Sequence, residues 1–299
     1  MTPRRPRGRA ITRALLRRMP LPPLHGDDDK ESRGRVLVVG GSALVPGALL
    51  LAGVAALRAG AGKLQLATVR SAATALAIAV PEALVVPLMQ SRTGEIAGSR
   101  AAAALRKYAG DTDALLLGPG MAAGPAAGAL LIALLRFIGD DTILVLDGAG
   151  AIALGDHPGV LASRDGRAVL TPHAGEMASL LGIDKRDVES EPAATARLAA
   201  GRFAAVVALK GPKSWIAHPD GTLLSYDGGS VGLGTSGSGD TLAGIVAGLA
   251  ARGADPLTAA AWAVWAHGTA GRNLARRMAT VGFLARELLA EVPALVGRG

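Results

Sequence analysis

A glycine-rich loop with one acid stands in the stretch GLGTSGSGDTLAGIVAGLAARG, which covers residues 232–253. Gly237, Ser238 and Gly239 precede an apolar run that is typical of a helix, and Asp240 stands where the loop enters that run. Backbone N–H groups in such a loop, with the unpaired first turn of a helix, form a pocket for phosphate oxygens. A carboxylate in this pocket is repelled by the bound anion, so its presence indicates a chemical task other than anion binding.

One task for Asp240 is to accept the proton of a substrate hydroxyl while the oxygen attacks a terminal phosphoryl group. We expect the N-terminus of a helix that begins at Thr241 to keep the carboxylate ionised, and therefore basic. The alternative is an ordinary N-cap, because aspartate is a preferred residue at that position. Both interpretations fit the loop when it is taken by itself.

Two further segments carry polar side chains of types that bind phosphates or donate hydrogen bonds to a substrate. The turn KGPKS, residues 210–214, places two lysines beside a glycine, which suits a diphosphate; the alternative is a surface turn. In TPHAGE, residues 171–176, the neutral imidazole of His173 can donate a hydrogen bond. Alternatively, Thr171–Pro172 start a helix and Glu176 merely favours its N-terminal dipole.

These segments need a scaffold, and the chain offers strands that alternate with helices. The expected strands are Arg35–Gly41, Lys63–Thr68, Asp113–Gly120, Thr142–Gly148, Arg167–Glu176, Ala204–Gly211 and a hairpin over Ser214–Tyr226. The expected helices are Gly47–Ala61, Gly128–Phe137, one near Leu180, and three that begin near Thr241, Pro256 and Val281. This repetition predicts a mostly parallel, doubly wound sheet covered on both faces. Four strands end in glycine or a polar turn, where such sheets bind ligands.

Composition excludes several classes of site. The chain has no cysteine, so disulfides and thiolate metal sites are impossible, and we expect a cytoplasmic protein. Neither a Walker A loop nor a Rossmann fingerprint is present, and the five histidines lack metal-ligand spacing. No secretory signal or membrane-spanning run is visible.

The net charge of +8 comes from the start of the chain. Seven arginines precede the first acid, Asp27, and the remainder carries 25 basic against 24 acidic residues. These arginines are Arg4, Arg5, Arg7, Arg9, Arg13, Arg17 and Arg18. They form either an arm that touches phosphate or membrane, or a solvated start followed by a short helix over Ile11–Met19. We expect the second, and hence no nucleic-acid or membrane partner.

The quoted segments together resemble one family of the ribokinase-like superfamily, the ADP/ATP-dependent NAD(P)H-hydrate dehydratases. The similar segments are GRVLVVGGS, GALLLAGVAALRAGAGKLQLAT, LLLGPGM, LTPHAGEMASLLG, VVALKG and GSGDTLAGIVAGLAARGADPLTAAAWAVWAHGTAG, in that order. They span roughly Gly34 to Asn273, and TPHAGE together with GSGDTLAG is highly specific. The resemblance implies a three-layer α/β sandwich, a mostly parallel sheet with helices on both faces. It also implies metabolite repair: a nucleotide, ADP or ATP, phosphorylates the ring hydroxyl of NADHX or NADPHX, and phosphate elimination restores NAD(P)H.

The resemblance also implies roles for residues at the matching positions. Asp240 is the implied catalytic residue and also contacts the substrate, together with Ala48, Gly120 and His173. The implied nucleotide-binding residues are Lys210, Gly211, Pro212, Lys213, Ser214, Gly237, Ser238 and Gly239. Glu176 is the implied helper in holding Mg²⁺.

This sequence departs from the family pattern in two loops. Family members commonly read D-A-D-A where residues 147–150 read DGAG, and residues 226–236 lack the usual Asn-Pro-Gly-Met segment. Ser214 stands where threonine is usual. These changes either loosen substrate contacts or mark a divergent member with weaker or altered activity.

We therefore expect a basic arm with a short helix over residues 1–33 and a single catalytic domain over residues 34–299. A small-molecule kinase of the same superfamily, acting on hydroxyethylthiazole or hydroxymethylpyrimidine, is one alternative function. A non-catalytic nucleotide-sensing module is the other. We also expect a homo-oligomer, and an NAD(P)HX epimerase on a separate chain. The sequence does not choose between ADP and ATP.

Overall fold

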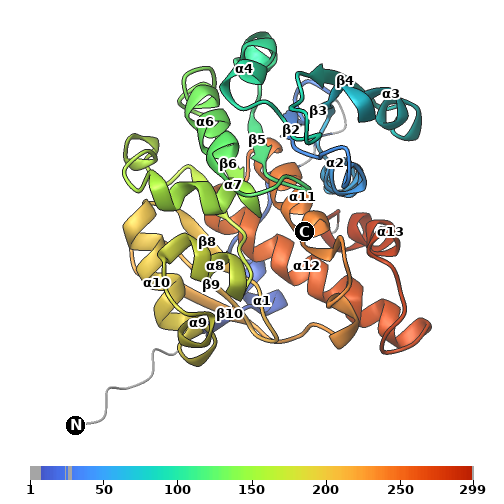
Figure 1. The fold of residues 1–299 in the computed structure, drawn as a ribbon. Helices are drawn as coiled ribbons and strands as arrows, with labels where there is room; N and C mark the ends of the chain where they lie inside the picture. Colours follow the sequence, from blue (N-terminus) through green and yellow to red (C-terminus); the bar gives the residue numbers. More distant parts are fainter. Residues whose placement is uncertain (1–7, 24, 26–28, 298–299) are drawn as a thin grey trace.

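The computed structural model describes residues 8–23, 25 and 29–297, and it contains one twisted sheet of ten strands (Figure 1). Their spatial order is β1-β10-β9-β8-β7-β6-β5-β2-β3-β4. Their bounds are β1 Arg9–Ala10, β2 Arg35–Val39, β3 Lys63–Val69, β4 Ala83–Leu88, β5 Ala114–Leu117, β6 Ile143–Leu146, β7 Ala168–Leu170, β8 Val206–Leu209, β9 Ser214–Ala217 and β10 Leu223–Tyr226. Of these strands, β9 alone runs against its two neighbours. The predicted hairpin is therefore present as β9 and β10.

Alternate residues of the central strands enter different hydrophobic cores. Val36 and Val38 of β2 belong to one core cluster, whereas Leu37 and Val39 belong to the other. Because side chains of a strand point alternately to the two faces of a sheet, both faces are buried. This is the three-layer arrangement, with helices on each side of a mostly parallel sheet, that the sequence predicts.

The two faces carry different sets of helices. One face packs against α1 Arg13–Leu16, α2 Gly47–Arg58, α11 Ser238–Ala251, α12 Pro256–Arg277 and α13 Ala285–Val296. The other packs against α4 Ser99–Ala102, α6 Pro125–Leu134, α7 Ala149–Ile152, α8 Ala174–Leu181, α9 Lys185–Ser190 and α10 Pro192–Phe203. The helix α3 Arg70–Ala79 contributes to both clusters, and α5 Arg106–Ala109 to the second. No helix in the described ranges is long and apolar enough to cross a membrane.

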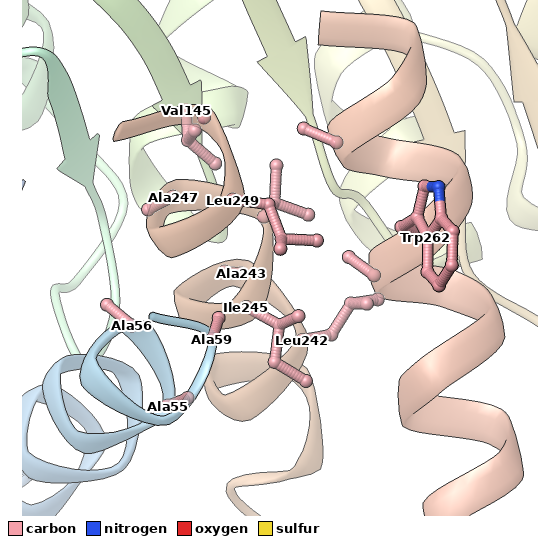
Figure 2. Packing of buried hydrophobic residues seen from close by; sticks show 14 of the residues in the cluster. Ala55, Ala56, Ala59, Val145, Leu242, Ala243, Ile245, Ala247, Leu249 and Trp262 are labelled. Atoms are coloured by element: carbon pink, nitrogen blue, oxygen red, sulfur yellow. The ribbon is translucent and has the colours of Figure 1, made fainter. Parts of the chain in front are cut away.

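Helices α2 and α11 approach closely because α11 has glycines at their contact. A Cβ added at Gly244 would lie 2.1 Å from the carbonyl oxygen of Ala52, and one at Gly248 would lie 2.4 Å from that of Ala56. Ala55 and Ala59 lie beside α11 (Figure 2), with their Cβ atoms 2.8 Å from a Cβ added at Gly244 and at Gly248, respectively. This contact fixes the position of α11, whose N-terminus carries the glycine loop.

The described N-terminal segment packs onto the domain. The strand β1 pairs with β10 at the edge of the sheet, and Leu15 and Leu16 are buried in the core. The short helix predicted over Ile11–Met19 is observed as α1, whereas Arg4, Arg5 and Arg7 lie outside the described residues. Arg9 and Ala10 are exposed, whereas Ile11, Leu15, Leu16 and Leu21 are buried, so the segment that contains α1 is part of the core. The domain boundary at residue 34 stays a prediction.

Candidate active site

The predicted site segments meet at one edge of the sheet. Strands β2, β5, β6, β7 and β8 are adjacent and parallel, so the loops after them lie side by side. The loop after β7 pairs with the end of β8 through a bridge between His173 and Lys210, and the N–H of Lys210 donates to the carbonyl of Pro172 at 2.8 Å. The polar groups of KGPKS and TPHAGE are thereby fixed against one another.

A partly buried lysine holds two carboxylates together in this position. The ammonium of Lys210 donates to Asp147 Oδ1 at 2.9 Å and lies 3.7 Å from Glu176 Oε2. Thr171 also donates its hydroxyl to Asp147 Oδ1, at 2.7 Å. Burial lowers the pKa of Lys210, but the charges of Asp147 and Glu176 outweigh it, so the pKa is raised and the lysine stays charged.

Asp240 completes an acidic cluster around this lysine. Helix α11 begins at Ser238 rather than at Thr241, because Gly237 adopts a left-handed backbone (φ 87°) that occupies the N-cap position. Asp240 therefore lies in the first turn of the helix, and the N-cap interpretation is wrong.

The environment of Asp240 also corrects its expected electrostatics. Burial is the largest effect on this carboxyl, and together with the charges of Asp147 and Glu176 it raises the pKa of Asp240 to about 6, against the opposing charge of Lys210. The helix N-terminus thus does not hold the pKa at its ordinary value, because burial outweighs it. At neutral pH the group is still mostly ionised, and it is a stronger base than an exposed aspartate.

The glycine loop presents backbone donors for an anion. The N–H groups of Gly237 and Gly239 bond to no described residue, whereas that of Ser238 donates to the carbonyl of Thr235 at 3.2 Å. A Cβ added at Gly239 would lie 3.1 Å from the Lys210 ammonium, so the loop and the lysine face the same space. Two of the three predicted amides are therefore available to phosphate oxygens.

A cavity of about 680 Å³ opens beside the loop. Seven residues predicted to bind nucleotide or substrate line it: His173, Lys210, Gly211, Pro212, Ser214, Ser238 and Gly239. Lys213, Gly237 and Asp240 do not line it, and the Lys213 ammonium instead lies 4.7 Å from the ring centroid of Trp215. Residues that the sequence did not single out complete the wall, among them Tyr226, Val231, Leu242, Val264 and His267.

His173 has a defined orientation at the start of α8. Its Nδ1 accepts hydrogen bonds from the N–H groups of Gly175 and Glu176, at 3.0 and 3.2 Å. A neutral ring in this arrangement carries its proton on Nε2, which lies 3.4 Å from Glu176 Oε1, and the His173 side chain is exposed, so a ligand can reach it. Glu176 accepts the His173 N–H at 2.8 Å, so the two residues form a capping box. The alternative that Glu176 supports a helix start is thus observed, alongside its ion pair with Lys210.

Ala48 and Gly120 lie together, but outside the wall of the cavity. A Cβ added at Gly120 would lie 2.8 Å from Cβ of Ala48 and 2.5 Å from the carbonyl oxygen of Val45. Gly120 also has a positive φ of 68°, so glycine is required there. The loops after β2 and β5 therefore approach each other closely at the same sheet edge as Asp147.

His267 is a site residue that the motifs did not reveal. It lies on α12, lines the cavity, and its Nε2 is 2.9 Å from the hydroxyl oxygen of Ser238. Burial is the main cause that lowers its pKa to about 4, with the Lys210 charge acting in the same direction. The ring is therefore neutral at physiological pH and orients the serine of the glycine loop.

Comparison with known proteins shows the family of the chain. Residues 36–294 match the family model described as NAD(P)H-hydrate dehydratase. The chain belongs to this family. It is 54% identical to an ADP-dependent (S)-NAD(P)H-hydrate dehydratase of Xanthomonas campestris, over 98% of both chains.

A more distant relative of known structure shares the fold, and another is similar in sequence. The structure of a Bacillus subtilis ADP/ATP-dependent NAD(P)H-hydrate dehydratase, co-crystallized with ATP/Mg²⁺, superposes with a TM-score of 0.79 at 26% identity, covering 97% of this chain and 98% of that one. A bifunctional NAD(P)H-hydrate repair enzyme of Moorella thermoacetica is 36% identical over 95% of this chain. This chain spans only 53% of that bifunctional protein. The ribokinase-like fold expected from the sequence is confirmed.

Proposed function

We propose that the protein dehydrates hydrated NADH and NADPH to NADH and NADPH, using a nucleotide as phosphoryl donor. The observation that carries the proposal is a partly buried aspartate, Asp240, with a pKa near 6 at the mouth of a glycine loop. It lies beside a lysine that faces the same loop. A base of that strength is suited to take a proton from an alcohol at neutral pH.

The proposed reaction proceeds in two stages. Asp240 accepts the proton of the ring hydroxyl while its oxygen bonds to the terminal phosphorus, and the bond from phosphorus to the nucleotide's bridging oxygen breaks. The carbon–oxygen bond of the phosphorylated ring then breaks, and phosphate leaves together with a proton from the neighbouring carbon. The sum is the loss of one water from the hydrated cofactor and the hydrolysis of one phosphoanhydride.

The proposed donor site is the cavity of about 680 Å³. Lys210 to Ser214 form one wall, with Gly237, Ser238 and Gly239 as the loop for the transferring phosphate. Lys210 is best placed for that phosphate, because its ammonium lies beside the position of Gly239. We propose ADP as the donor, as in the relatives of Xanthomonas campestris and Bacillus subtilis that are named ADP-dependent.

The proposed substrate site lies on the other side of Asp240, with Ala48, Gly120 and His173 as contacts. The close approach of the loops after β2 and β5 leaves backbone rather than side chains at this edge. His173 can donate from Nε2 to the ribose or the nicotinamide amide.

The acidic cluster fits a magnesium ion held chiefly by the nucleotide. Mg²⁺ usually binds through one or two carboxylates, with waters and phosphates as the other ligands. Asp147 and Glu176 are carboxylates of this kind, and no group of three or more His, Asp or Glu side chains in the described ranges could hold a metal by itself. When bound, the ion neutralises charge on the transferring phosphoryl group.

The deciding experiment incubates purified protein with NADHX, Mg²⁺ and either ADP or ATP, and follows NADH absorbance. We expect recovery of NADH with release of one phosphate for each NADH formed. Accumulation of a stable phosphorylated product would instead indicate a small-molecule kinase, and binding of nucleotide without turnover would indicate a sensor. The hydroxyethylthiazole kinase of Pyrococcus horikoshii shares only the fold, at 17% identity.

Three further properties concern the partner, the location and the assembly of the enzyme. This chain matches about half the length of the bifunctional repair enzyme of Moorella thermoacetica, and an NAD(P)HX epimerase on a separate chain stays a prediction. The cytoplasmic location and the homo-oligomeric state stay predictions, which fractionation and light scattering can test.

A further inference from the structure

A second cavity, of about 330 Å³, lies where the N-terminal segment crosses α12 and α13. It shares no lining residue with the cavity beside the glycine loop. The side chains that define its chemistry are Arg13, Leu16, Arg17, Trp262, Trp265 and Leu295. No part of the proposed reaction uses them.

The charge of this cavity is uncompensated by the described residues. Arg13 and Arg17 form no ion pair with a described acidic side chain, and no acidic residue lines the cavity. The two arginines are four residues apart at α1, so both reach the same cavity. Guanidinium groups bind phosphates and carboxylates through paired hydrogen bonds.

The remaining walls are aromatic and aliphatic. The rings of Trp262 and Trp265 are perpendicular, with centroids 5.7 Å apart, and the guanidinium of Arg13 lies 5.6 Å from the centroid of Trp265. Trp262 donates its indole N–H to the carbonyl of Met19 at 2.7 Å, so its polar atom is already satisfied. Leu16 is buried beneath the cavity. Such walls favour a flat apolar body, because aromatic surfaces pack well against rings.

The described chain does not supply an anion of this kind. Outside the described ranges, residues 1–7 have three arginines and no acid in their sequence, and residues 26–28 include Asp27 and Asp28. The volume is near the lower end of the range for small-molecule sites, roughly 300–1,000 Å³.

We propose that this cavity binds a small planar aromatic molecule that bears a phosphate or a carboxylate. Arg13 and Arg17 bind the anionic group, and the ring lies against Trp262, Trp265 and Leu295. This site is separate from the proposed catalytic site, and its test needs no turnover.

Tryptophan fluorescence provides a direct assay, because two of the three tryptophans of the chain line this cavity. In the Trp215→Phe protein the signal comes from Trp262 and Trp265 alone. We titrate AMP and benzoate as the two anionic probes, with adenosine and benzamide as their neutral counterparts. AMP represents a nucleotide ligand and benzoate an aromatic acid, so the tighter probe distinguishes these sources. We expect saturable quenching by at least one anion, with its neutral counterpart at least tenfold weaker.

Variants locate the binding. In the Trp215→Phe background, Arg13→Gln with Arg17→Gln should weaken the anion at least tenfold. Arg18→Gln, an exposed arginine outside the cavity wall, should leave the affinity within a factor of two. Ala294→Phe, at an exposed position on the cavity wall, should also weaken binding by filling the space. Quenching must persist in Lys210→Met, which excludes binding in the larger cavity.

Several results overturn the proposal. The proposal is wrong if neither anion quenches the fluorescence saturably up to the millimolar range. It is also wrong if the neutral counterparts bind as tightly as the anions, or if Arg18→Gln loses as much affinity for the anion as the double arginine variant. Unchanged binding in both Ala294→Phe and the double arginine variant would also overturn the proposal, provided that circular dichroism shows both variants to be folded.

Discussion

Replacement of Asp240 by asparagine is expected to stabilise the folded protein while it removes the proposed base. Burial and the neighbouring carboxylates raise the pKa of this group from 3.8 to about 6, so the folded state disfavours its ionised form. A difference of roughly two pH units corresponds to about 3 kcal/mol at about 1.4 kcal/mol per unit. An asparagine does not ionise and avoids this cost, so the gain in unfolding free energy is at most about 3 kcal/mol.

The gain depends on pH with a definite sign. Below the unfolded pKa of 3.8 the carboxyl is neutral in both states, and wild type and Asp240→Asn should be about equally stable. As the pH rises towards the folded pKa of about 6, the unfolded state loses its proton first and the wild type loses stability. The advantage of the variant is therefore complete above about pH 6. For a chain of this size, 3 kcal/mol corresponds to roughly 5 °C in Tm.

The assay is thermal unfolding of both proteins at about pH 4 and about pH 7.5, with turnover measured in parallel. We expect the variant to gain between about 2 and 5 °C at the higher pH only, and to lose at least about a hundredfold in kcat. Asp255→Ala is a matched control, because Asp255 caps α12 by accepting from the N–H groups of Leu257 and Thr258, both at 3.0 Å. It should lose about 1 kcal/mol instead. If Asp240→Asn lowers Tm as this control does, the carboxylate has a structural role and our reasoning is refuted.

Three further substitutions probe the site and its support. Replacing His267 by phenylalanine removes the 2.9 Å hydrogen bond to Ser238. The loss of this hydrogen bond should cost about 1 kcal/mol of nucleotide-binding free energy and so raise the KM for nucleotide about fivefold in steady-state kinetics. An increase smaller than twofold would show that His267 does not position Ser238 for the nucleotide. Lys210→Met removes the charge that lowers the pKa of Asp240, so the acid limb of the pH profile of kcat should move above pH 6. An acid limb that does not move would show that the charge of Lys210 does not influence the titration of Asp240. Gly244→Ala places a Cβ 2.1 Å from a carbonyl oxygen and should cost about 1–3 kcal/mol in urea unfolding, whereas Gly201→Ala in α10 meets no atom within 4 Å and should be neutral or stabilising.

The sequence predicted the central strands of the sheet but missed both edge strands, β1 and β4. Strand β4 and the preceding α3 have no counterpart among the predicted elements. The strand ALVVPL contains Pro87, which argues against a central strand, but β4 pairs only with β3 and an edge tolerates proline. Half of the helix RSAATALAIA is alanine and its polar face is weak, so its period was hard to recognise.

The site was predictable where its residues follow strands. His173 and Lys210 come directly after neighbouring strands, and parallel order brings such residues together without further knowledge. His267 could not be found in this way, because it reaches Ser238 only through the packing of α12 against α11. The sequence does contain a signal for His267, which is the one histidine in the alanine-rich segment AAAWAVWAHGTAG. The raised pKa of Asp240 was likewise hidden, because burial is a property of the folded chain.

The acidic cluster explains why a carboxylate can stand in an anion-binding loop. Asp147 and Glu176 fix the ammonium of Lys210, and the same two charges raise the pKa of Asp240. An exposed aspartate would be ionised but a weak base, whereas a carboxylate with a pKa near 6 is both ionised at neutral pH and a better proton acceptor. A bound polyphosphate adds negative charge beside Asp240 and raises its pKa further by the same physics, while Lys210 and a cation oppose that rise. The basicity of Asp240 is therefore set by the balance of charge at the phosphate site, so proton transfer is favoured when the donor nucleotide is in place.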